Sequence, residues 1–474
     1  MNKKLKEGFI FTTLAQIANV FSVLAVNIIL SHKLAPRDFG IITMVQVIAT
    51  FINLFTGEAV PSAIIQNKQL ARRDYSVLFN YSVVLGSVAT LLFGLCGFVF
   101  AFIFNDTIYI PVSWVMSIMV LTSFLNCVPQ GLFLKNMSFK ALSIRRIVSS
   151  ILGMAFGIGA VFLGAGLYAI AISLVVPAVF TLIFSLMYVK IPIIFSLEIK
   201  PLKQISTYMI EQTKFSVLNY GYRNIDNVLI GKFLGPTALG YYSKSYQLLS
   251  QPITLFLGVV TPVLQPVLSN YQDDVKYIRD FYMKFCRMVA FLAVPLSVFF
   301  ALNSKEIVYF LFGHQWTKAI LPMSILSLSI WVQLLSQIIT PIWQSRNLPK
   351  IQTKNGKISF TLIALFICAG IMLHSVLFVA VAVSCSYYLN FLISAHLVLK
   401  YALESKLSRL LRILVLPVMS GIVSAVILML VMPFTNFPSL FLTLFVRGII
   451  WLLEVIFFLV LTGNLKDILS VLGK

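Results

Sequence analysis

The sequence predicts an all-α polytopic membrane protein with about 14 transmembrane helices, arranged as two parallel six-helix lobes plus two C-terminal helices. Its composition, its uncharged runs and an internal repeat indicate this fold class. The chain has 474 residues, of which 59% are apolar and only 11% are charged. A soluble domain carries about 25% charged residues. Because a folded protein of this size still exposes a large surface, the low fraction of charged residues indicates that much of this surface lies in the hydrocarbon core of a membrane.

Long runs without Asp, Glu, Lys or Arg predict where the individual membrane-spanning helices lie. A spanning helix needs about 20 apolar residues, and Gly8–His32 and Tyr75–Asn105 each satisfy this length. The runs Ile147–Val189 and Ile358–Leu399 are long enough for two helices each. We expect helices at 9–31, 39–62, 75–102, 111–134, 145–163, 167–189, 209–231, 238–266, 281–302, 319–343, 357–373, 376–398, 410–431 and 440–462.

The distribution of positive charge predicts the orientation of the chain. The formal net charge is +21, which by itself is compatible with a nucleic-acid partner. With the N-terminus in the cytoplasm, however, 28 Lys and Arg residues fall in cytoplasmic segments, five in outer segments and three within helices. The positive-inside rule accounts for this asymmetry, whereas a nucleic-acid patch clusters on one face. We therefore expect a bacterial inner-membrane protein with both termini cytoplasmic, and no nucleic acid as partner.

An internal repeat organises the chain. The stretch Asn27–Gly40 aligns without a gap with Asn227–Gly240, at a constant offset of 200 residues. The identical pairs are Asn19/Asn219, Asn27/Asn227, Leu34/Leu234, Pro36/Pro236 and Gly40/Gly240. Both copies lie at the outer loop that follows the first helix of a six-helix set. Since six is even, the sets are parallel repeats, an arrangement in which transporters bind substrate at the repeat interface. Chance similarity between two hydrophobic hairpins is the alternative.

The repeat predicts four segments. These are an N-terminal six-helix lobe at 1–189, a cytoplasmic interfacial linker at 190–214, a C-terminal six-helix lobe at 215–400, and extra helices 13 and 14 with a cytoplasmic tail at 401–474. The linker assignment depends on Pro192, Pro201 and four lysines.

Each repeat-starting helix carries a polar stripe. On the helix at 209–231, a spacing of i, i+4, i+7 and i+8 places four polar side chains on one face. They are Asn219, Arg223, Asp226 and Asn227. The first helix carries Gln16, Asn19 and Asn27. We expect the two stripes to face each other across a central cavity and to contact the substrate.

Ionisable groups at membrane depth are the strongest candidates for function, because each costs at least about 2.5–3.5 kcal/mol at a helix centre. Arg223 is the first candidate for an anion contact, since guanidinium grips phosphate in a bidentate fork. Lys244 adds a point charge, or alternatively snorkels to the outer interface. Asp226 couples transport to protons or sodium, or pairs structurally with Arg223. Glu58 either lines water as a second coupling group or is a plain interfacial residue.

Two further ionisable residues lie in the helix at 440–462, outside the repeat. Arg447 and Glu454 are seven residues apart and share a face. We expect them to have a structural or partner-binding role.

The sequence contains no motif for metal, cofactor or nucleotide chemistry. The five cysteines have no paired spacing, and no His, Cys, Asp or Glu cluster has metal-ligand spacing. There is no phosphate-binding P-loop and no nucleophile elbow. We therefore expect no catalytic residue, no metal and no cofactor, and a secondary transporter rather than an enzyme.

Two stretches of the chain resemble a known family. The first contains Leu34-Ala-Pro-Arg-Asp-Phe-Gly40 and Ser62-Ala-Ile-Ile-Gln66, followed by Asp74 and Phe79. The second contains Asp226-Asn-Val-Leu-Ile-Gly231, Leu234-Gly-Pro236, Gly240-Tyr-Tyr242 and Tyr246. Through these fold markers the chain resembles the polysaccharide flippases, the O-antigen and exopolysaccharide branch of the multidrug/oligosaccharidyl-lipid/polysaccharide exporter superfamily.

The resemblance implies an alternating-access cavity and a substrate carried on undecaprenyl diphosphate. Arg223 and Lys244 would then meet the diphosphate, and tyrosines around the second repeat would meet the sugars. Expected partners are the lipid-linked oligosaccharide, membrane lipids, a coupling proton or sodium, and neighbouring polysaccharide polymerase and glycosyltransferase. The alternatives are a drug/cation antiporter of the same fold, a flippase for the peptidoglycan precursor, a membrane-embedded saccharide polymerase or ligase, and a channel.

Overall fold

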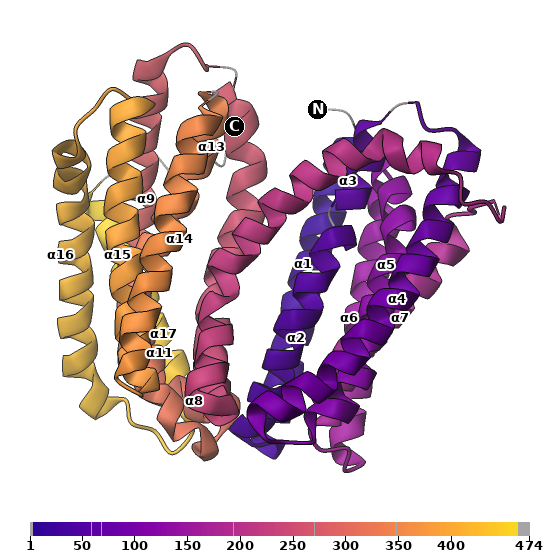
Figure 1. Cartoon of the computed structure of the whole chain (residues 1–474). Helices are drawn as coiled ribbons and strands as arrows, with labels where there is room; N and C mark the ends of the chain where they lie inside the picture. Colours follow the sequence, from indigo (N-terminus) through magenta and orange to yellow (C-terminus); the bar gives the residue numbers. More distant parts are fainter. Residues whose placement is uncertain are drawn as a thin grey trace. The chain divides into compact units, whose positions relative to one another are not determined.

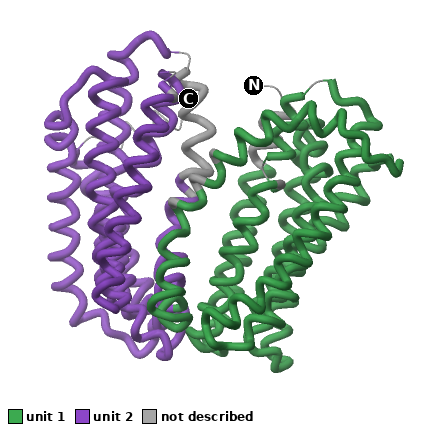
Figure 2. Tube along the Cα trace, viewed as in Figure 1, with its two compact units in different colours: residues 1–240 green, residues 241–474 purple. Residues whose placement is uncertain are grey.

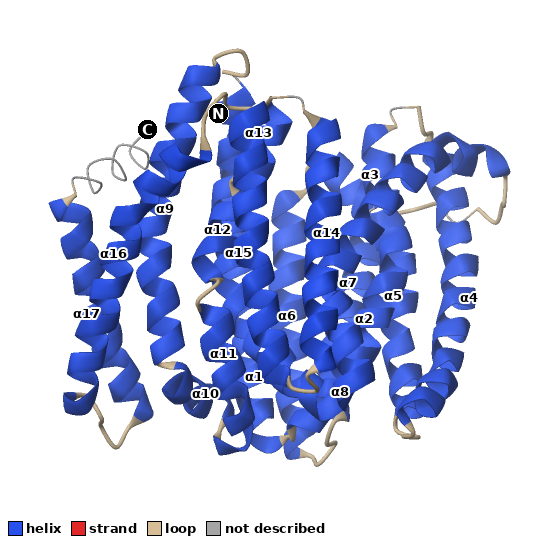
Figure 3. Ribbon diagram, turned by 60° about the vertical axis from the view of Figure 1, so that its left-hand side comes forward, coloured by secondary structure: helices blue, strands red, loops and turns tan. Residues whose placement is uncertain are grey.

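The computed structural model describes residues 3–57, 59–67, 69–192, 194–269, 271–346 and 348–462. Over these residues the chain is helical and contains no strand (Figure 3). It divides into two compact units, residues 1–240 and 241–474 (Figure 2).

The first unit contains seven helices and the first part of an eighth (Figure 1). They are α1 (Lys3–Lys33), α2 (Pro36–Gly57), α3 (Ala59–Gln66), α4 (Arg72–Phe104), α5 (Tyr109–Lys135), α6 (Phe139–Phe162), α7 (Tyr168–Tyr188) and α8 (Ile199–Ser269). Helix α5 is central, because it packs against α2, α3, α4 and α7. Helix α6 packs against α1 and α7.

The second unit contains the rest of α8 and the remaining helices. They are α9 (Val275–Leu302), α10 (Ser304–Phe312), η1 (His314–Ala319), α11 (Ile320–Ser327), α12 (Ile330–Gln337), α13 (Ile339–Ser345), α14 (Pro349–Met372), α15 (Val376–Tyr401), α16 (Leu407–Val431), η2 (Met432–Phe434) and α17 (Leu440–Leu461). Helix α9 packs against α11, α12, α16 and α17, and α15 packs against α11, α12 and α14.

The membrane-spanning helices agree with the predicted fold class. Among the described residues, eleven helices are long and apolar enough to cross a membrane, and the bent pair His314–Ser327 and Ile330–Ser345 would make a twelfth. Each overlaps one predicted range. The other two predicted ranges, 209–231 and 238–266, both lie in α8, which is helical there but is not among these candidates. The all-α polytopic class is confirmed, and the total of fourteen is compatible with the structure.

Long apolar side chains remain on the outside of these helices. Leu91, Leu95 and Phe98 on α4 are 56%, 51% and 53% exposed. Such a continuous exposed apolar face is unfavourable in water. It is the face that a spanning helix presents to lipid.

The repeat marks a close approach of two helix starts. Pro36 begins α2, and Pro236 resumes α8 after Gly235, whose φ of 84° and ψ of 173° are not helical. A Cβ atom added to Gly40 would lie 1.7 Å from Pro236 O, and one added to Gly240 would lie 1.9 Å from Pro36 O. The contacts are therefore reciprocal between matching positions of the repeat, and only glycine leaves room for them.

The segment before α8 is held against α4. Residues 190–192 and 194–198 are not helical. Asn80 Nδ2 donates to Ile194 O at 2.7 Å, and Tyr81 OH donates to Leu197 O at 2.8 Å. On the first turns of α8, Ile205 joins the buried apolar cluster that includes Ile64 on α3. The predicted boundaries of the linker and of the two lobes stay a prediction.

Candidate functional site

Two members of the polar stripe of α1 accept hydrogen bonds from α6. Arg146 Nη1 donates to Gln16 Oε1 at 3.2 Å, and Ser150 Oγ donates to Asn19 Oδ1 at 3.0 Å. The third member, Asn27, donates locally to Val23 O at 2.7 Å. The stripe therefore includes a packing seam between α1 and α6.

On α8, the two charged residues of the stripe differ in burial. Asp226 is 5% exposed, and its Oδ1 accepts a hydrogen bond from the backbone N–H of Asn227 at 2.8 Å. Arg223 is exposed, and among the described residues its guanidinium has no hydrogen-bond or ion-pair partner. The structural Arg223–Asp226 pair considered from the sequence is therefore not observed.

The amides of the same stripe are only partly described. Asn227 Oδ1 is buried and has no hydrogen-bond partner among the described residues. Tyr220, one turn before Asn224, donates its hydroxyl proton to Val47 O of α2 at 2.7 Å. The side chain of Asn219 lies outside what the structure describes, and so does Glu58.

In the second unit, Lys244 is enclosed by protein. It is 2% exposed, and its Nζ lies 5.4 Å from the centroid of the Phe312 ring, within cation–π range. A lysine that snorkels to an interface keeps its ammonium group in water. The structure therefore excludes the snorkelling alternative. Ser245, the next residue, donates to Ala319 O at 3.1 Å and fixes this part of α8 against η1.

Aromatic side chains accompany Lys244. The Tyr241 ring meets that of Trp316 edge-on at 6.0 Å, and Tyr242 stacks with Tyr246 at 6.1 Å. The hydroxyl oxygens of Tyr246 and Tyr387 are 2.8 Å apart. A lysine ammonium group near an aromatic ring, with tyrosine side chains on the same helix, has the chemistry to bind a phosphorylated sugar.

The structure also contains an apolar groove in the first unit, between α2, α4, α5 and the start of α8. Its volume is about 690 Å³, and its walls include Phe55, Leu92 and Met209. Among the residues that line the groove, Lys214 is the cationic one. The groove suits a hydrocarbon chain.

Arg447 is a structural hub for the last two helices. It is 1% exposed. Its guanidinium donates to Asn303 Oδ1 at 2.9 Å and Glu306 Oε1 at 3.1 Å, and on the other side to Thr435 Oγ1 at 3.0 Å and Asn436 Oδ1 at 2.8 Å. These bonds tie α17 to α9, α10 and the turn after η2.

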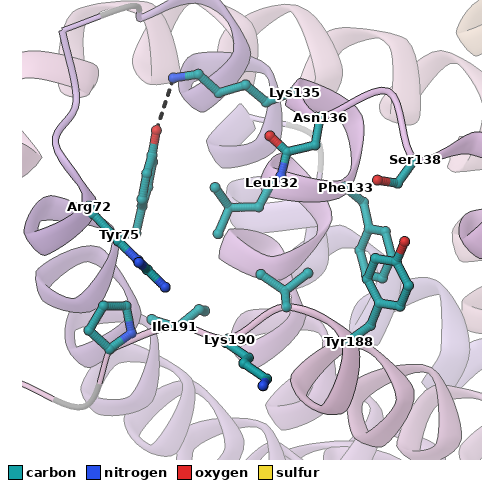
Figure 4. Close-up of a pocket in the computed structure, with 12 residues that line it drawn as sticks. Arg72, Tyr75, Leu132, Phe133, Lys135, Asn136, Ser138, Tyr188, Lys190 and Ile191 are labelled. Atoms are coloured by element: carbon teal, nitrogen blue, oxygen red, sulfur yellow. Dashed lines mark hydrogen bonds between the residues drawn. The ribbon is translucent and has the colours of Figure 1, made fainter.

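Sequence reasoning missed a second group of cations. Arg72, Lys135 and Lys190 counted only toward the charge asymmetry, yet they line one pocket of the first unit (Figure 4). They are far apart along the chain, so no local motif indicates them.

Comparison with known families gives a match over most of the chain. Residues 15–321 match the model of a family described as "Polysaccharide biosynthesis protein".

Curated relatives of this chain have names from the same area. It is 24% identical to the teichuronic acid biosynthesis protein TuaB of Bacillus subtilis (strain 168), over 56% of each chain. It is 23% identical to the lipopolysaccharide biosynthesis protein WzxC of Escherichia coli (strain K12), over 72% of this chain and 69% of WzxC. It is 22% identical to the succinoglycan biosynthesis transport protein ExoT of Rhizobium meliloti (strain 1021), over 64% of this chain and 61% of ExoT. The chain thus spans less than two thirds of the lengths of TuaB and ExoT.

Solved structures show the fold more completely. The inward closed conformation of the lipid II flippase MurJ superposes with a TM-score of 0.75 at 14% identity, covering 96% of this chain and 99% of MurJ. An inward-facing multidrug resistance MATE transporter of the MOP superfamily gives a TM-score of 0.61 at 13% identity, covering 79% of this chain and 93% of that one. The family match over residues 15–321 shows that the chain belongs to the polysaccharide biosynthesis protein family, and the superpositions show that it shares the fold of these solved transporters.

Proposed function

We propose that this protein is a secondary transporter that flips undecaprenyl-diphosphate-linked oligosaccharide from the inner to the outer leaflet of the bacterial cytoplasmic membrane, by alternating access, for surface polysaccharide biosynthesis. One observation carries the substrate class: Lys244 is only 2% exposed, and its Nζ lies 5.4 Å from the centroid of the Phe312 ring. A cation at such depth is costly and favours an anionic substrate. A drug/cation antiporter needs an acidic pocket instead.

In this proposal Arg223 and Lys244 bind the diphosphate, while Asn19, Asn27, Asn219, Asn227 and Gln16 contribute polar contacts. The rocking lobes are residues 1–189 and 215–400, joined by the linker at 190–214, and residues 401–474 are an appended pair of helices with the tail. The apolar groove near Met209 holds part of the polyprenyl chain. Family membership and the fold support this assignment.

Orientation and coupling complete the proposal. The 28-to-5 charge asymmetry supports an inner-membrane location with both termini in the cytoplasm. Asp226, with Glu58 as a second group, couples transport to protons or sodium. The polymerase and glycosyltransferases of the same pathway are the expected neighbours, and the chain itself catalyses no reaction.

The test is substitution of the two cations. Arg223→Ala and Lys244→Met should each abolish surface polysaccharide in a host that depends on this protein, while membrane levels of the protein stay normal. Loss of one charge-assisted hydrogen bond costs about 1.5–3 kcal/mol, which is roughly a 10- to 100-fold loss in affinity. Substrate binding by the purified variants measures this loss.

The matched control is Lys232→Ala, which removes an exposed cation from the same helix. This variant should keep normal surface polysaccharide. Normal polysaccharide in both Arg223→Ala and Lys244→Met would disprove the assigned cation sites, and transport of a cationic drug in place of the saccharide-lipid would disprove the substrate class.

A further inference from the structure

The pocket lined by Arg72, Lys135 and Lys190 lies where three helices end together. Arg72 begins α4, Lys135 ends α5, and Tyr188 ends α7. Each of these residues is also the end of a candidate membrane span. The pocket has a volume of about 400 Å³ and lies wholly within residues 1–240 (Figure 4). It therefore opens at the level where a spanning unit meets the lipid headgroups.

The lining of this pocket is cationic. Its twelve residues include Arg72, Lys135 and Lys190 but no Asp or Glu. Two acidic residues near these cations in the sequence have other partners: Asp74 Oδ2 accepts from the N–H of Ala71 at 2.8 Å, and Glu198 pairs with Arg73 at 2.5 Å. Three like charges around one concavity repel one another unless an anion lies between them.

The hydrogen-bonding capacity of these cations is mostly unused. Among the described residues, Arg72 and Lys190 have no hydrogen-bond or ion-pair partner. Lys135 Nζ donates to Asn67 O at 2.8 Å and to Tyr75 OH at 3.0 Å. An ammonium group has three donors, so one remains. The pocket thus offers several N–H donors to one acceptor-rich group.

The opposite wall is aromatic (Figure 4). The Phe133 and Tyr188 rings stack with centroids 4.9 Å apart. Arg145 supports Phe133 from behind at 5.0 Å and is itself held by Ser185 Oγ at 2.6 Å and Gln130 Oε1 at 2.5 Å. Tyr188 is 54% exposed, as is common for tyrosine at a membrane boundary. The wall closes the pocket on one side.

Exposed apolar side chains precede Tyr188 on α7. Met187 on α7 is 77% exposed and Leu186 is 40% exposed, one turn or less from the aromatic wall. An occupant with a phosphate head and apolar tails would satisfy both the cations and these side chains. Basic pockets between spanning helices bind anionic lipid headgroups by this combination.

We propose that this pocket binds the phosphate headgroup of an anionic phospholipid, separately from the transport substrate. Lysines and arginines that only orient a protein in the membrane can be fully solvated at its surface and need not line a pocket. Here, cations from two helix ends and a loop line one concavity, and Ser76 Oγ holds that loop by donating to Pro192 O at 2.5 Å. A bound lipid would join α4, α5 and α7 at this boundary.

The test uses the full-length purified protein and native mass spectrometry. The probes are a phosphatidylglycerol, a phosphatidylcholine with the same acyl chains, and inorganic phosphate. Wild-type protein should retain phosphatidylglycerol over phosphatidylcholine by about tenfold or more, and R72Q/K190Q should lose that preference. The control K200Q/K203Q removes two exposed lysines outside the pocket and should behave as wild type.

Three outcomes would overturn the proposal. These are equal retention of both lipids by wild type, unchanged preference in R72Q/K190Q, and displacement of phosphatidylglycerol by millimolar inorganic phosphate, which would indicate a free-phosphate site. Gel filtration and thermal unfolding in phosphatidylcholine check that the double variant is folded. If it is not, the single variant Arg72→Gln, at an exposed side chain, decides between the same outcomes.

Discussion

Single cations of this protein lie in three kinds of surroundings, and the surroundings separate their roles. Arg447 has four oxygen acceptors from neighbouring side chains and is enclosed. Lys244 is enclosed beside an aromatic ring. Arg72 stands at an open pocket without an acidic neighbour in its lining. A satisfied, enclosed cation stabilises the fold, while a cation with donors left over is available to a ligand.

Arg447→Met is expected to destabilise the second unit. Removing the guanidinium leaves Glu306 and several amide and hydroxyl groups without their partner, and breaking a buried ion pair costs about 3–5 kcal/mol. Thermal unfolding of the purified protein measures the effect. Arg412→Met, at an exposed position of α16, is the control and should change stability little. Equal melting temperatures for the two variants would contradict the structural role.

Asp226→Asn is expected to uncouple transport from the ion gradient. Asp226 is 5% exposed on the polar face of α8, and in the proposed coupling role its carboxylate binds a proton or a sodium ion. In vesicles, flipping by the wild-type protein should accelerate when an ion gradient is imposed, and flipping by the variant should not respond. Glu211→Gln, an exposed acid on the same helix that pairs with Lys214, is the control. An undiminished response of Asp226→Asn would refute the coupling role.

The internal repeat corresponds to a structural contact between two helix starts, that of α2 and that of the second part of α8. Proline is favoured in the first turn of a helix, because its missing N–H has no intrahelical partner there. Pro36 and Pro236 occupy this place in α2 and in the second part of α8. The glycines four residues later let the two helix starts touch reciprocally, backbone to backbone.

Gly40→Ala and Gly240→Ala should each separate these helix starts. Their added Cβ atoms would lie 1.7 Å and 1.9 Å from a proline carbonyl oxygen, and overpacking of this kind costs about 1–3 kcal/mol. Gly356→Ala in α14 has no atom within 4 Å of its Cβ, so it should instead stabilise by about 0.5–1 kcal/mol. Melting temperatures give the comparison, and an increase in all three variants would contradict the reciprocal contact.

The molecule as a whole combines two compact units with one charge asymmetry. In the proposed orientation the basic loops lie on the cytoplasmic side, as the positive-inside rule predicts. This orientation predicts on which side of the membrane each loop lies.

Reporter fusions test that topology. Alkaline phosphatase, active only outside the cytoplasm, should be active when fused after Phe437 and inactive when fused after Glu404. A fluorescent protein that folds in the cytoplasm should give the opposite pattern at the same two positions. Activity of the phosphatase at both sites, or the reverse order, would show that the proposed orientation is wrong.

The sequence by itself determined the fold class, twelve of the span positions and the family resemblance, because the transfer of a 20-residue apolar segment into lipid depends on local composition. It also indicated the repeat, whose matching glycines the structure brings into contact. It indicated that the polar residues of α1 share a face, but periodicity along one helix does not identify the helix opposite. The partners of Gln16 and Asn19 on α6 came only from the structure.

Tertiary structure alone decided which cations act together. Arg72 and Lys135 lie at the ends of α4 and α5, and Lys190 lies in the loop after α7, so only the packing of these three helices brings them to one pocket. It also decided that Lys244 is enclosed and that Arg447 is a structural hub. The physical reason is that burial and electrostatic pairing depend on distances between side chains remote in sequence, whereas insertion into lipid depends on each segment separately.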